Sequence, residues 1–212
     1  LSLNNKEAYI HIDSTSRYTL RRIQRAGRQC DQLGIENIEL SGTWSLAEQW
    51  AFYQGFTKPK HPGNIKFAKL SLDEEKTLAQ RIKLVEWVKT QANMGPSICT
   101  PLHLTHAAED LIKEVAQDQY EIISEYFVGE ELLQHGYVGC YNVGRGSVNP
   151  PVLLSIKIFP KNKSKSPIKA AIIGKGITFD SGGLFLKPCE GIVDMKFDMC
   201  GAATVLGVIK AI

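Results

Sequence analysis

The chain has 212 residues, with 25 Lys and Arg side chains against 22 Asp and Glu, which leaves a formal net charge of +3. Proteins that hold nucleic acid through its phosphates carry dense patches of cations and are usually strongly basic, so this balance argues against a nucleic-acid partner. With 43% hydrophobic and 22% charged residues, the composition is that of a globular protein and excludes intrinsic disorder. The length allows one large domain or two small ones.

The sequence also bears on where the protein resides. It contains no run of about 18 apolar residues, and residues 1–6 lack the basic-then-apolar pattern of a secretory signal. Its five cysteines are odd in number and never spaced as Cys-x-x-Cys, so neither a disulfide framework nor a structural zinc knuckle is indicated. We therefore expect a soluble cytoplasmic protein with reduced thiols and no membrane partner.

Residues 1–70 predict a small α/β domain. Apolar residues at helical spacing alternate there with short apolar runs that are typical of strands. The expected elements are a strand at 8–12, a helix at 17–33, a strand at 35–40 and a helix from 46 to 55. Gly34 is expected to end the first helix, and Gly55 with the loop at 58–63 is expected to end the second.

Two helix starts follow this domain. Ser71 and Glu74 form a capping box, and apolar residues at helical spacing behind it predict a long helix over 71–92 that joins two domains. Thr100 and Pro101 then supply the N-cap and the first-turn proline of a further helix.

Residues 93–212 predict the first part of a second α/β domain. Strands are expected at 120–123, 152–158 and 168–173, of which the last two should be buried. The Lys- and Ser-rich segment 161–165 is expected to be a solvated loop rather than a binding patch. Because strands alternate with helices, we expect an α/β fold whose second domain contains a mixed, largely parallel sheet.

The most informative stretch is the glycine-rich run Gly174-Lys-Gly-Ile-Thr-Phe-Asp-Ser-Gly-Gly183 and the residues that follow it as far as Ala203. It places two lysines and two carboxylates just beyond a predicted buried strand: Lys175, Asp180, Lys187 and Asp198. In an α/β sheet the ligand crevice lies outside the carboxyl ends of the strands. We therefore expect a functional site here.

Common nucleotide and hydrolase motifs do not fit this run. A phosphate-binding loop of the Walker type would need glycine where Lys169 stands and Ser or Thr where Gly176 stands. A dinucleotide fingerprint would need a third glycine in place of Phe179. Ser181 is preceded by an aspartate and followed by two glycines, so it is not the nucleophile of a Gly-x-Ser-x-Gly elbow.

What remains is a carboxylate site for metal ions. The two oxygens of Asp180 could bridge two divalent ions about 3.5 to 4 Å apart, and Asp198 could hold one of them. A lysine amine binds a metal only when it is neutral, which the ion itself can enforce, whereas a lysine that stays charged could polarise a carbonyl. Lys175 and Lys187 suit those two roles.

In this stretch the sequence resembles the leucyl aminopeptidase family of dinuclear metallopeptidases, and more closely its bacterial peptidase B branch. The resemblance rests on the run 174–183, on Lys187 and on Met195-Lys-x-Asp-Met-x-Gly-Ala-Ala203. Weaker matches, such as the Val143-Gly-Arg-Gly-Ser147 turn, extend it over nearly the whole chain.

The resemblance implies a role for each of the four charged residues. Lys175 and Asp180 would be metal ligands, with Asp180 shared between two ions; Asp198 would be a further ligand, and Lys187 would face the carbonyl or its oxyanion. The implied reaction is the release of N-terminal amino acids from short peptides by two-metal hydrolysis. The implied cofactors are two divalent ions of manganese, zinc or magnesium, and the implied assembly of the complete enzyme is a homo-hexamer.

Several features predict that the chain is the N-terminal portion of such an enzyme. The family's second motif, Asn-Thr-Asp-Ala-Glu-Gly-Arg, carries two further carboxylate ligands and an arginine, and it does not occur here. The chain begins at Leu1 rather than Met and stops at Ile212 inside an apolar helix without a capping glycine. We expect 1–70 to be an N-terminal domain, 71–92 the joining helix and 93–212 the first part of the catalytic domain, the rest being absent or supplied by a second chain.

A second hypothesis comes from a different class of function. The chain would be a catalytically incompetent fragment that acts as an assembly or binding module, with no tight metal binding and no companion polypeptide. Stoichiometric uptake of manganese or zinc that is lost on Asp180→Ala would count against it.

Four other residues have simpler interpretations than catalysis. His103 and His106 lie three apart on a predicted helix, but no Glu-x-x-His context accompanies them, so solvated positions are favoured over a zinc site. Cys189 and Cys200 flank the glycine-rich run, and nothing in the sequence pairs either thiol with a histidine. We expect them to be neutral neighbours of the site rather than nucleophiles.

Overall fold

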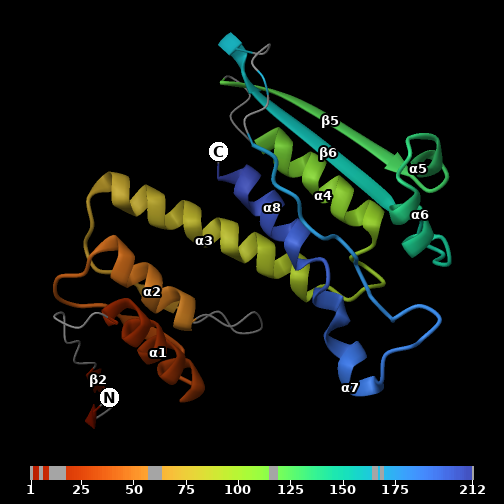
Figure 1. Ribbon diagram of the computed structural model, residues 1–212. Coiled ribbons are helices and arrows are strands. Elements are labelled where there is room, and N and C mark those ends of the chain that lie inside the picture. Colours follow the sequence, from red (N-terminus) through yellow and green to blue (C-terminus); the bar gives the residue numbers. More distant parts are fainter. Residues whose placement is uncertain are drawn as a thin grey trace. The chain divides into compact units, whose positions relative to one another are not determined.

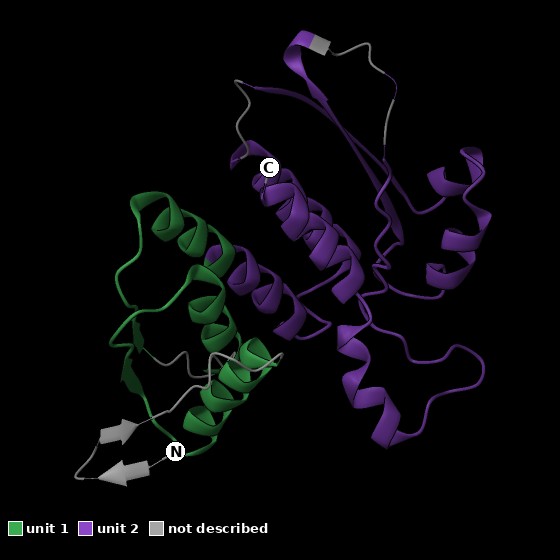
Figure 2. Ribbon diagram, turned by 60° about the vertical axis from the view of Figure 1, so that its left-hand side comes forward, with its two compact units in different colours: residues 1–82 green, residues 83–212 purple. Residues whose placement is uncertain are grey.

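A computed structural model describes residues 2–4, 7–9, 18–56, 64–114, 119–163, 167 and 170–211 of the chain (Figure 1). The chain forms two compact units, Leu1–Ile82 and Lys83–Ile212 (Figure 2). The boundary between them falls inside the long helix α3 (Leu72–Asn93). The expected division into 1–70, 71–92 and 93–212 stays a prediction.

The first unit is built on two packed helices and two short strand pairs. Its described elements are β1 (Ser2–Asn4), β2 (Glu7–Tyr9), α1 (Thr19–Gln32), β3 (Asn37–Glu39), α2 (Leu46–Phe56) and β4 (Asn64–Lys66). β1 and β2 pair antiparallel, and β3 and β4 pair parallel. The core of the unit consists of buried side chains from the helices and from the residues that follow β3 and β4, namely Ile23, Cys30, Leu40, Ala51, Phe52, Phe56 and Ala68.

Helices α1 and α2 cross with their backbones in near contact, because both have a glycine at the crossing. A methyl group added at Gly55 would lie 1.9 Å from the carbonyl oxygen of Gln24, and one added at Gly27 would lie 2.5 Å from that of Phe52. Gly55 was expected to end α2, but it lies within that helix and serves this close approach. Gly34, with a φ of +73°, does follow the end of α1 as expected.

The expected elements of this unit are largely confirmed. Helix α1 and strand β3 lie within the predicted ranges 17–33 and 35–40. The strand expected at 8–12 overlaps β2, although residues 10–12 lie outside the described part of the chain, as does the loop at 58–63. Strands β1 and β4 were not expected.

Substitution of Gly55 tests the helix crossing. Gly55→Ala should destabilise the protein by about 3 kcal/mol, because the added methyl meets backbone atoms that cannot rotate away. The control is Gln54→Ala at the exposed neighbouring position of α2, which should change stability by less than about 0.5 kcal/mol. Urea denaturation followed by circular dichroism measures both. Equal midpoints for the two variants would show that the crossing has room for a side chain.

The capping box predicted at the start of α3 is formed. The Ser71 hydroxyl and backbone N–H both donate to Oε2 of Glu74, at 2.7 and 3.1 Å, and the Glu74 N–H donates back to the Ser71 hydroxyl at 3.4 Å. These bonds lower the pKa of Glu74. The capping box satisfies first-turn donors that have no partner within the helix, so it fixes where α3 begins.

The second unit contains a long antiparallel strand pair with two helices against one face. Its described elements are α4 (Pro101–Glu114), β5 (Tyr120–Val128), α5 (Glu131–Gln134), α6 (Val138–Gly144), β6 (Val152–Pro160), the 3-10 helix η1 (Lys161–Lys163), α7 (Cys189–Ile192), the 3-10 helix η2 (Val193–Phe197) and α8 (Cys200–Lys210). Helices α4 and α8 lie side by side next to β5 and β6 (Figure 1). Helix α4 starts where predicted, with the His103 N–H donating to the Thr100 hydroxyl at 3.2 Å.

The core of this unit lies between α4, α8, the end of α3 and the strand pair. Its buried members are Ala92, Cys99, Leu104, Ala108, Leu111, Met199, Ala203 and Leu206. Ile122 of β5 and Leu154 and Ile156 of β6 pack against it, which places this face of the strand pair on the core. No helix in the described part of the chain is long and apolar enough to cross a membrane.

The α/β class is confirmed, but the strands of the second unit differ from the prediction in two ways. The described strands β5 and β6 run antiparallel, with Ile122 opposite Ile158, so the expected largely parallel sheet is not what these residues form. The strand expected at 168–173 is absent from the described residues of that range, where Ile172 and Ile173 are 63% and 93% exposed. A strand needs a hydrogen-bonded neighbour, and residues 170–173 have none among the described strands.

Candidate metal centre

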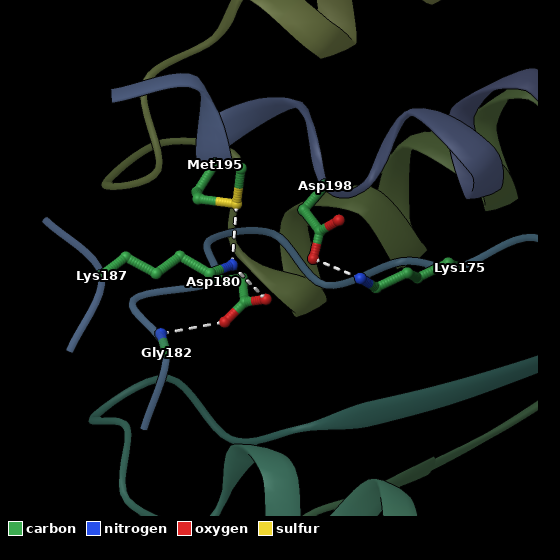
Figure 3. Close-up of polar contacts among 6 residues, drawn as sticks. All are labelled: Lys175, Asp180, Gly182, Lys187, Met195 and Asp198. Carbon is green, nitrogen blue, oxygen red and sulfur yellow. Dashed lines mark hydrogen bonds and ion pairs between the residues drawn. The ribbon is translucent and has the colours of Figure 1, made fainter. Parts of the chain in front are cut away.

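The four charged residues singled out in the sequence lie together in the second unit (Figure 3). Lys175 and Asp180 belong to the irregular segment that follows η1, and Lys187 lies just before α7. Asp198 lies between η2 and α8, so its position depends on where α8 begins. The site is therefore built from one glycine-rich loop and one helix start.

Asp180 and Lys187 form an ion pair within the loop. The Lys187 ammonium donates to Oδ2 of Asp180 at 2.6 Å, and the Gly182 N–H donates to Oδ1 at 3.0 Å. The pKa of Asp180 is lowered, most by the hydrogen bond from Lys187 and next by the one from Gly182. Asp180 is thus a carboxylate at neutral pH, with a partner on each oxygen.

A tight turn brings Lys187 back to Asp180. The Lys187 N–H donates to the Ser181 carbonyl at 2.9 Å. Gly182 has a φ of +97°, a backbone conformation that residues with a side chain rarely adopt. A methyl group added at Gly182 would also lie 2.5 Å from the Phe185 carbonyl oxygen. The turn also places the Lys187 ammonium 2.9 Å from the sulfur of Met195.

Lys175 and Asp198 form the second pair. The Lys175 ammonium lies 2.6 Å from Oδ2 of Asp198, and the two side chains are 56% and 20% exposed, respectively. Oδ2 of Asp198 is itself shielded from solvent, and the ammonium does not approach it in the geometry of a hydrogen bond. This shielded oxygen is compensated only by the charge of the Lys175 ammonium, so a metal ion bound here would take the place of that ammonium as the compensating cation.

The donor set suits hard or borderline divalent ions. It offers two carboxylates and two amines, and each carboxylate is neutralised by one ammonium. In the described part of the chain, no group of three or more His, Cys, Asp or Glu side chains could hold a metal ion. A metal bound by these residues would therefore use lysine nitrogen as well as carboxylate oxygen, which requires the amine to lose its proton.

The other candidate residues do not form a site among themselves. His103 Nε2 lies 3.3 Å from the amide oxygen of Gln91, a contact with α3 that accounts for the ring without a metal. Cys189 is exposed, and Cys200 is half-buried. Burial, and then the charge of Asp198, raises the pKa of Cys200, so its thiol is neutral at physiological pH and is no nucleophile.

The glycines that hold the site together were not predicted from the sequence. Gly174 and Gly201 bring the loop and the start of α8 into backbone contact, and Gly182 closes the turn between Asp180 and Lys187. The glycine-rich composition of the run was visible in the sequence, but which glycine contacts which backbone depends on the tertiary structure.

Thiol labelling tests the environment of the site. Cys140 and Cys189 are exposed and should react within minutes with a disulfide reagent at pH 8, whereas Cys30 and Cys99 should react only after unfolding. Burial raises the pKa of the Cys30 and Cys99 thiols, which leaves little thiolate in the folded protein. The variants Cys140→Ser and Cys189→Ser should each remove one fast equivalent. Fast labelling of Cys99 would contradict the packing of α4 against α8.

Comparison with known proteins identifies the class. Residues 86–212 match the catalytic domain of the cytosol aminopeptidase family, and residues 1–71 match a second family described as a peptidase. The first match alone covers more than half of the chain. The chain belongs to the cytosol aminopeptidase family, and the family resemblance of the glycine-rich run is thereby confirmed.

Among the individual relatives are Peptidase B proteins of two bacteria. The chain is 40% identical over 215 residues to Peptidase B of Pectobacterium carotovorum subsp. carotovorum (strain PC1), a match that covers 99% of this chain and 48% of that protein. It is likewise 40% identical over 212 residues to Peptidase B of Yersinia pestis (strain Pestoides F), with the same coverage. The chain thus spans about half the length of the curated relatives it matches.

Solved structures agree on the fold. The crystal structure of cytosol aminopeptidase from Coxiella burnetii is similar with a TM-score of 0.64 and 26% identity, over 78% of this chain and 35% of that one. A leucine aminopeptidase structure from Caenorhabditis elegans is similar with a TM-score of 0.54 and 27% identity, over 70% of this chain and 29% of that one. The α/β fold described above is therefore that of part of a leucyl aminopeptidase.

Proposed function

We propose that the chain is the N-terminal portion of a metal-dependent aminopeptidase that releases N-terminal amino acids from short peptides by two-metal hydrolysis. The observation that carries the proposal is the cluster of Lys175, Asp180, Lys187 and Asp198, in which a buried oxygen of Asp198 has no hydrogen bond. Membership of the family and the similarity to Peptidase B proteins support the reaction class.

Each of the four residues has a proposed part in this chemistry. Asp180 would be a ligand shared between two ions, which its oxygens would bind beside or in place of their bonds from Gly182 and Lys187, and Lys175 and Asp198 would be further ligands. When bound, the ions would act as Lewis acids and lower the pKa of water, so that it can attack at neutral pH. Lys187 is assigned to the substrate carbonyl, where an ammonium would stabilise negative charge as it develops.

The identity of the ions and the assembly are parts of the same proposal. Carboxylate and amine donors accept manganese, zinc or magnesium, and we propose two ions of manganese or zinc. The proposed cytoplasmic location rests on the sequence features given above, and the proposed homo-hexameric complete enzyme rests only on the resemblance to the family. The remaining ligands would come from outside this sequence, in a continuation of the chain or in a second polypeptide. The alternative of an incompetent binding module is supported by no observation on the described residues.

Metal binding tests the ligand assignment. Asp180→Ala and Asp198→Ala should each weaken Mn²⁺ binding by at least about 100-fold, because each removes an oxygen donor. Isothermal titration calorimetry of the chain with MnCl₂ measures the affinity. Asp194→Ala is the matched control: this aspartate is exposed on η2, close in sequence to Asp198, and its loss should leave the affinity unchanged. Equal affinity in all three variants would contradict the site.

Hydrolysis of a leucine anilide tests the need for further ligands. The 212-residue chain with added Mn²⁺ should show little turnover, because three ligands of an expected five cannot hold two ions in a competent geometry. Addition of a polypeptide that carries the Asn-Thr-Asp-Ala-Glu-Gly-Arg segment should produce turnover that a chelator abolishes. Robust, chelator-sensitive turnover by the 212-residue chain alone would show that the additional ligands are not required.

A further inference from the structure

We propose that Gly174 and Gly201 are positioning residues of the metal centre: their backbone contact sets the distance between Lys175 and Asp198. The significance of that distance for metal binding rests on the function proposed above. The contact itself is a feature of the described fold and can be tested independently of any activity.

The two glycines allow a contact that no other residue would permit. A methyl group added at Gly174 would lie 2.5 Å from the carbonyl oxygen of Gly201 and 2.6 Å from the Cα of Ala202. A methyl group added at Gly201 would lie 2.9 Å from the backbone nitrogen of Lys175 and 3.2 Å from its carbonyl oxygen. All four are backbone atoms, so the strain of a side chain here is relieved only by separating the two segments.

A hydrogen bond fixes the register of this contact. The Ala202 N–H donates to the Lys175 carbonyl at 2.9 Å. Ala202 lies in the first turn of α8, where backbone N–H groups have no acceptor within the helix, and the N-cap residue Met199 provides no side-chain cap. The loop therefore caps α8 at the point where the glycines touch, and the bond is lost if the segments move apart.

The contact acts on one of the two ion pairs only. Lys175 follows Gly174 directly, and Asp198 lies one turn before the contact point on α8, so this pair spans two segments that are distant in sequence. Asp180 and Lys187 lie in one loop, whose own turn through Gly182 holds them together. Separation of the segments should therefore displace Asp198 from Lys175 and leave the Asp180–Lys187 pair in place.

Gly176 offers a graded version of the same test. A methyl group added there would lie 3.2 Å from the Cβ of Ala202, a contact with a side chain rather than with backbone. Removal of that Cβ by Ala202→Gly should relieve the clash, so the double variant Gly176→Ala/Ala202→Gly is a rescue.

The first experiment compares Gly201→Ala with Gly191→Ala. Both glycines are helical, but Gly191 in α7 faces open space and serves as the control. The distance between Lys175 Nζ and Asp198 Oδ2 is 2.6 Å in the unmodified chain. In crystal structures of the variants, we expect it to be about 1 Å longer in Gly201→Ala and unchanged in Gly191→Ala. Mn²⁺ affinity, measured by calorimetry, should fall about 10- to 100-fold in Gly201→Ala only. An unchanged distance in Gly201→Ala would overturn the proposal.

The second experiment covers the case in which Gly201→Ala does not fold. Gly176→Ala should lengthen the same distance and weaken Mn²⁺ binding, and Ala202→Gly in the same chain should restore both, although a glycine inside α8 lowers the melting temperature further. A loss of metal affinity that follows the melting temperature, without rescue, would show a merely structural role and overturn the proposal.

The proposed function and the positioning role of the glycines can be contradicted independently of each other. Absence of Mn²⁺ binding by the unmodified chain would contradict the proposed function. The Lys175–Asp198 distance in the variant structures would then decide the positioning role by itself.

Discussion

The candidate centre depends on the packing of α8 against α4. Met199 is 1% exposed and lies in the core between these helices, together with Ala203 and Leu206 of α8 and Leu104 and Ala108 of α4. Burial of a Met or Leu side chain contributes roughly 1.5 to 3 kcal/mol, so Met199, Leu206 and Leu104 hold the start of α8 firmly. Asp198 directly precedes Met199 and has little freedom of its own. The hydrophobic core thereby determines where one of the two carboxylates of the site lies.

The loop that carries the other three charged residues has no comparable core. Leu184 is fully exposed, and Phe185 is 89% exposed, so this part of the loop is not held by burial of its apolar side chains. Backbone contacts hold it instead: the hydrogen bond from Ala202 to Lys175, the glycine contact beside it, and the turn from Ser181 to Lys187. Glycine is needed at these points because only backbone without a side chain can approach backbone this closely. A motif rich in glycine is thus the expected sequence signature of a site held in this way.

How far the sequence predicted this structure depends on whether the determining interactions are local. Helix starts were predicted well, since the Ser71–Glu74 box and the cap at Thr100 involve residues three apart. The four charged residues singled out in the sequence do lie together in two ion pairs, because one long motif carries them, while their roles as metal ligands and catalytic cation stay a prediction. The role of Gly55 was misjudged, because whether a glycine ends a helix or allows another to cross depends on the partner helix α1.

Strand pairing was predicted least well, for the same reason. The segment 168–173 is apolar, yet Ile172 and Ile173 are exposed, since an apolar run becomes a strand only when a neighbour accepts its hydrogen bonds. The antiparallel pairing of β5 with β6 was also not foreseen, although these strands follow one another with only the short helices α5 and α6 between them. Pairing is a non-local property, and composition and periodicity do not encode the partner.

If the centre holds two divalent ions, as proposed above, charge balance requires anionic ligands beyond the described residues. Two divalent ions bring four positive charges, and Asp180 and Asp198 supply two negative ones, each already neutralised by a lysine. If Lys175 gives up its proton to become a ligand, the cluster still carries an excess of positive charge, which is costly where water is partly excluded. Further carboxylates would remove that excess. The two aspartates of this chain can thus bind one metal ion by themselves, whereas the second ion of the proposed centre needs the additional anionic ligands.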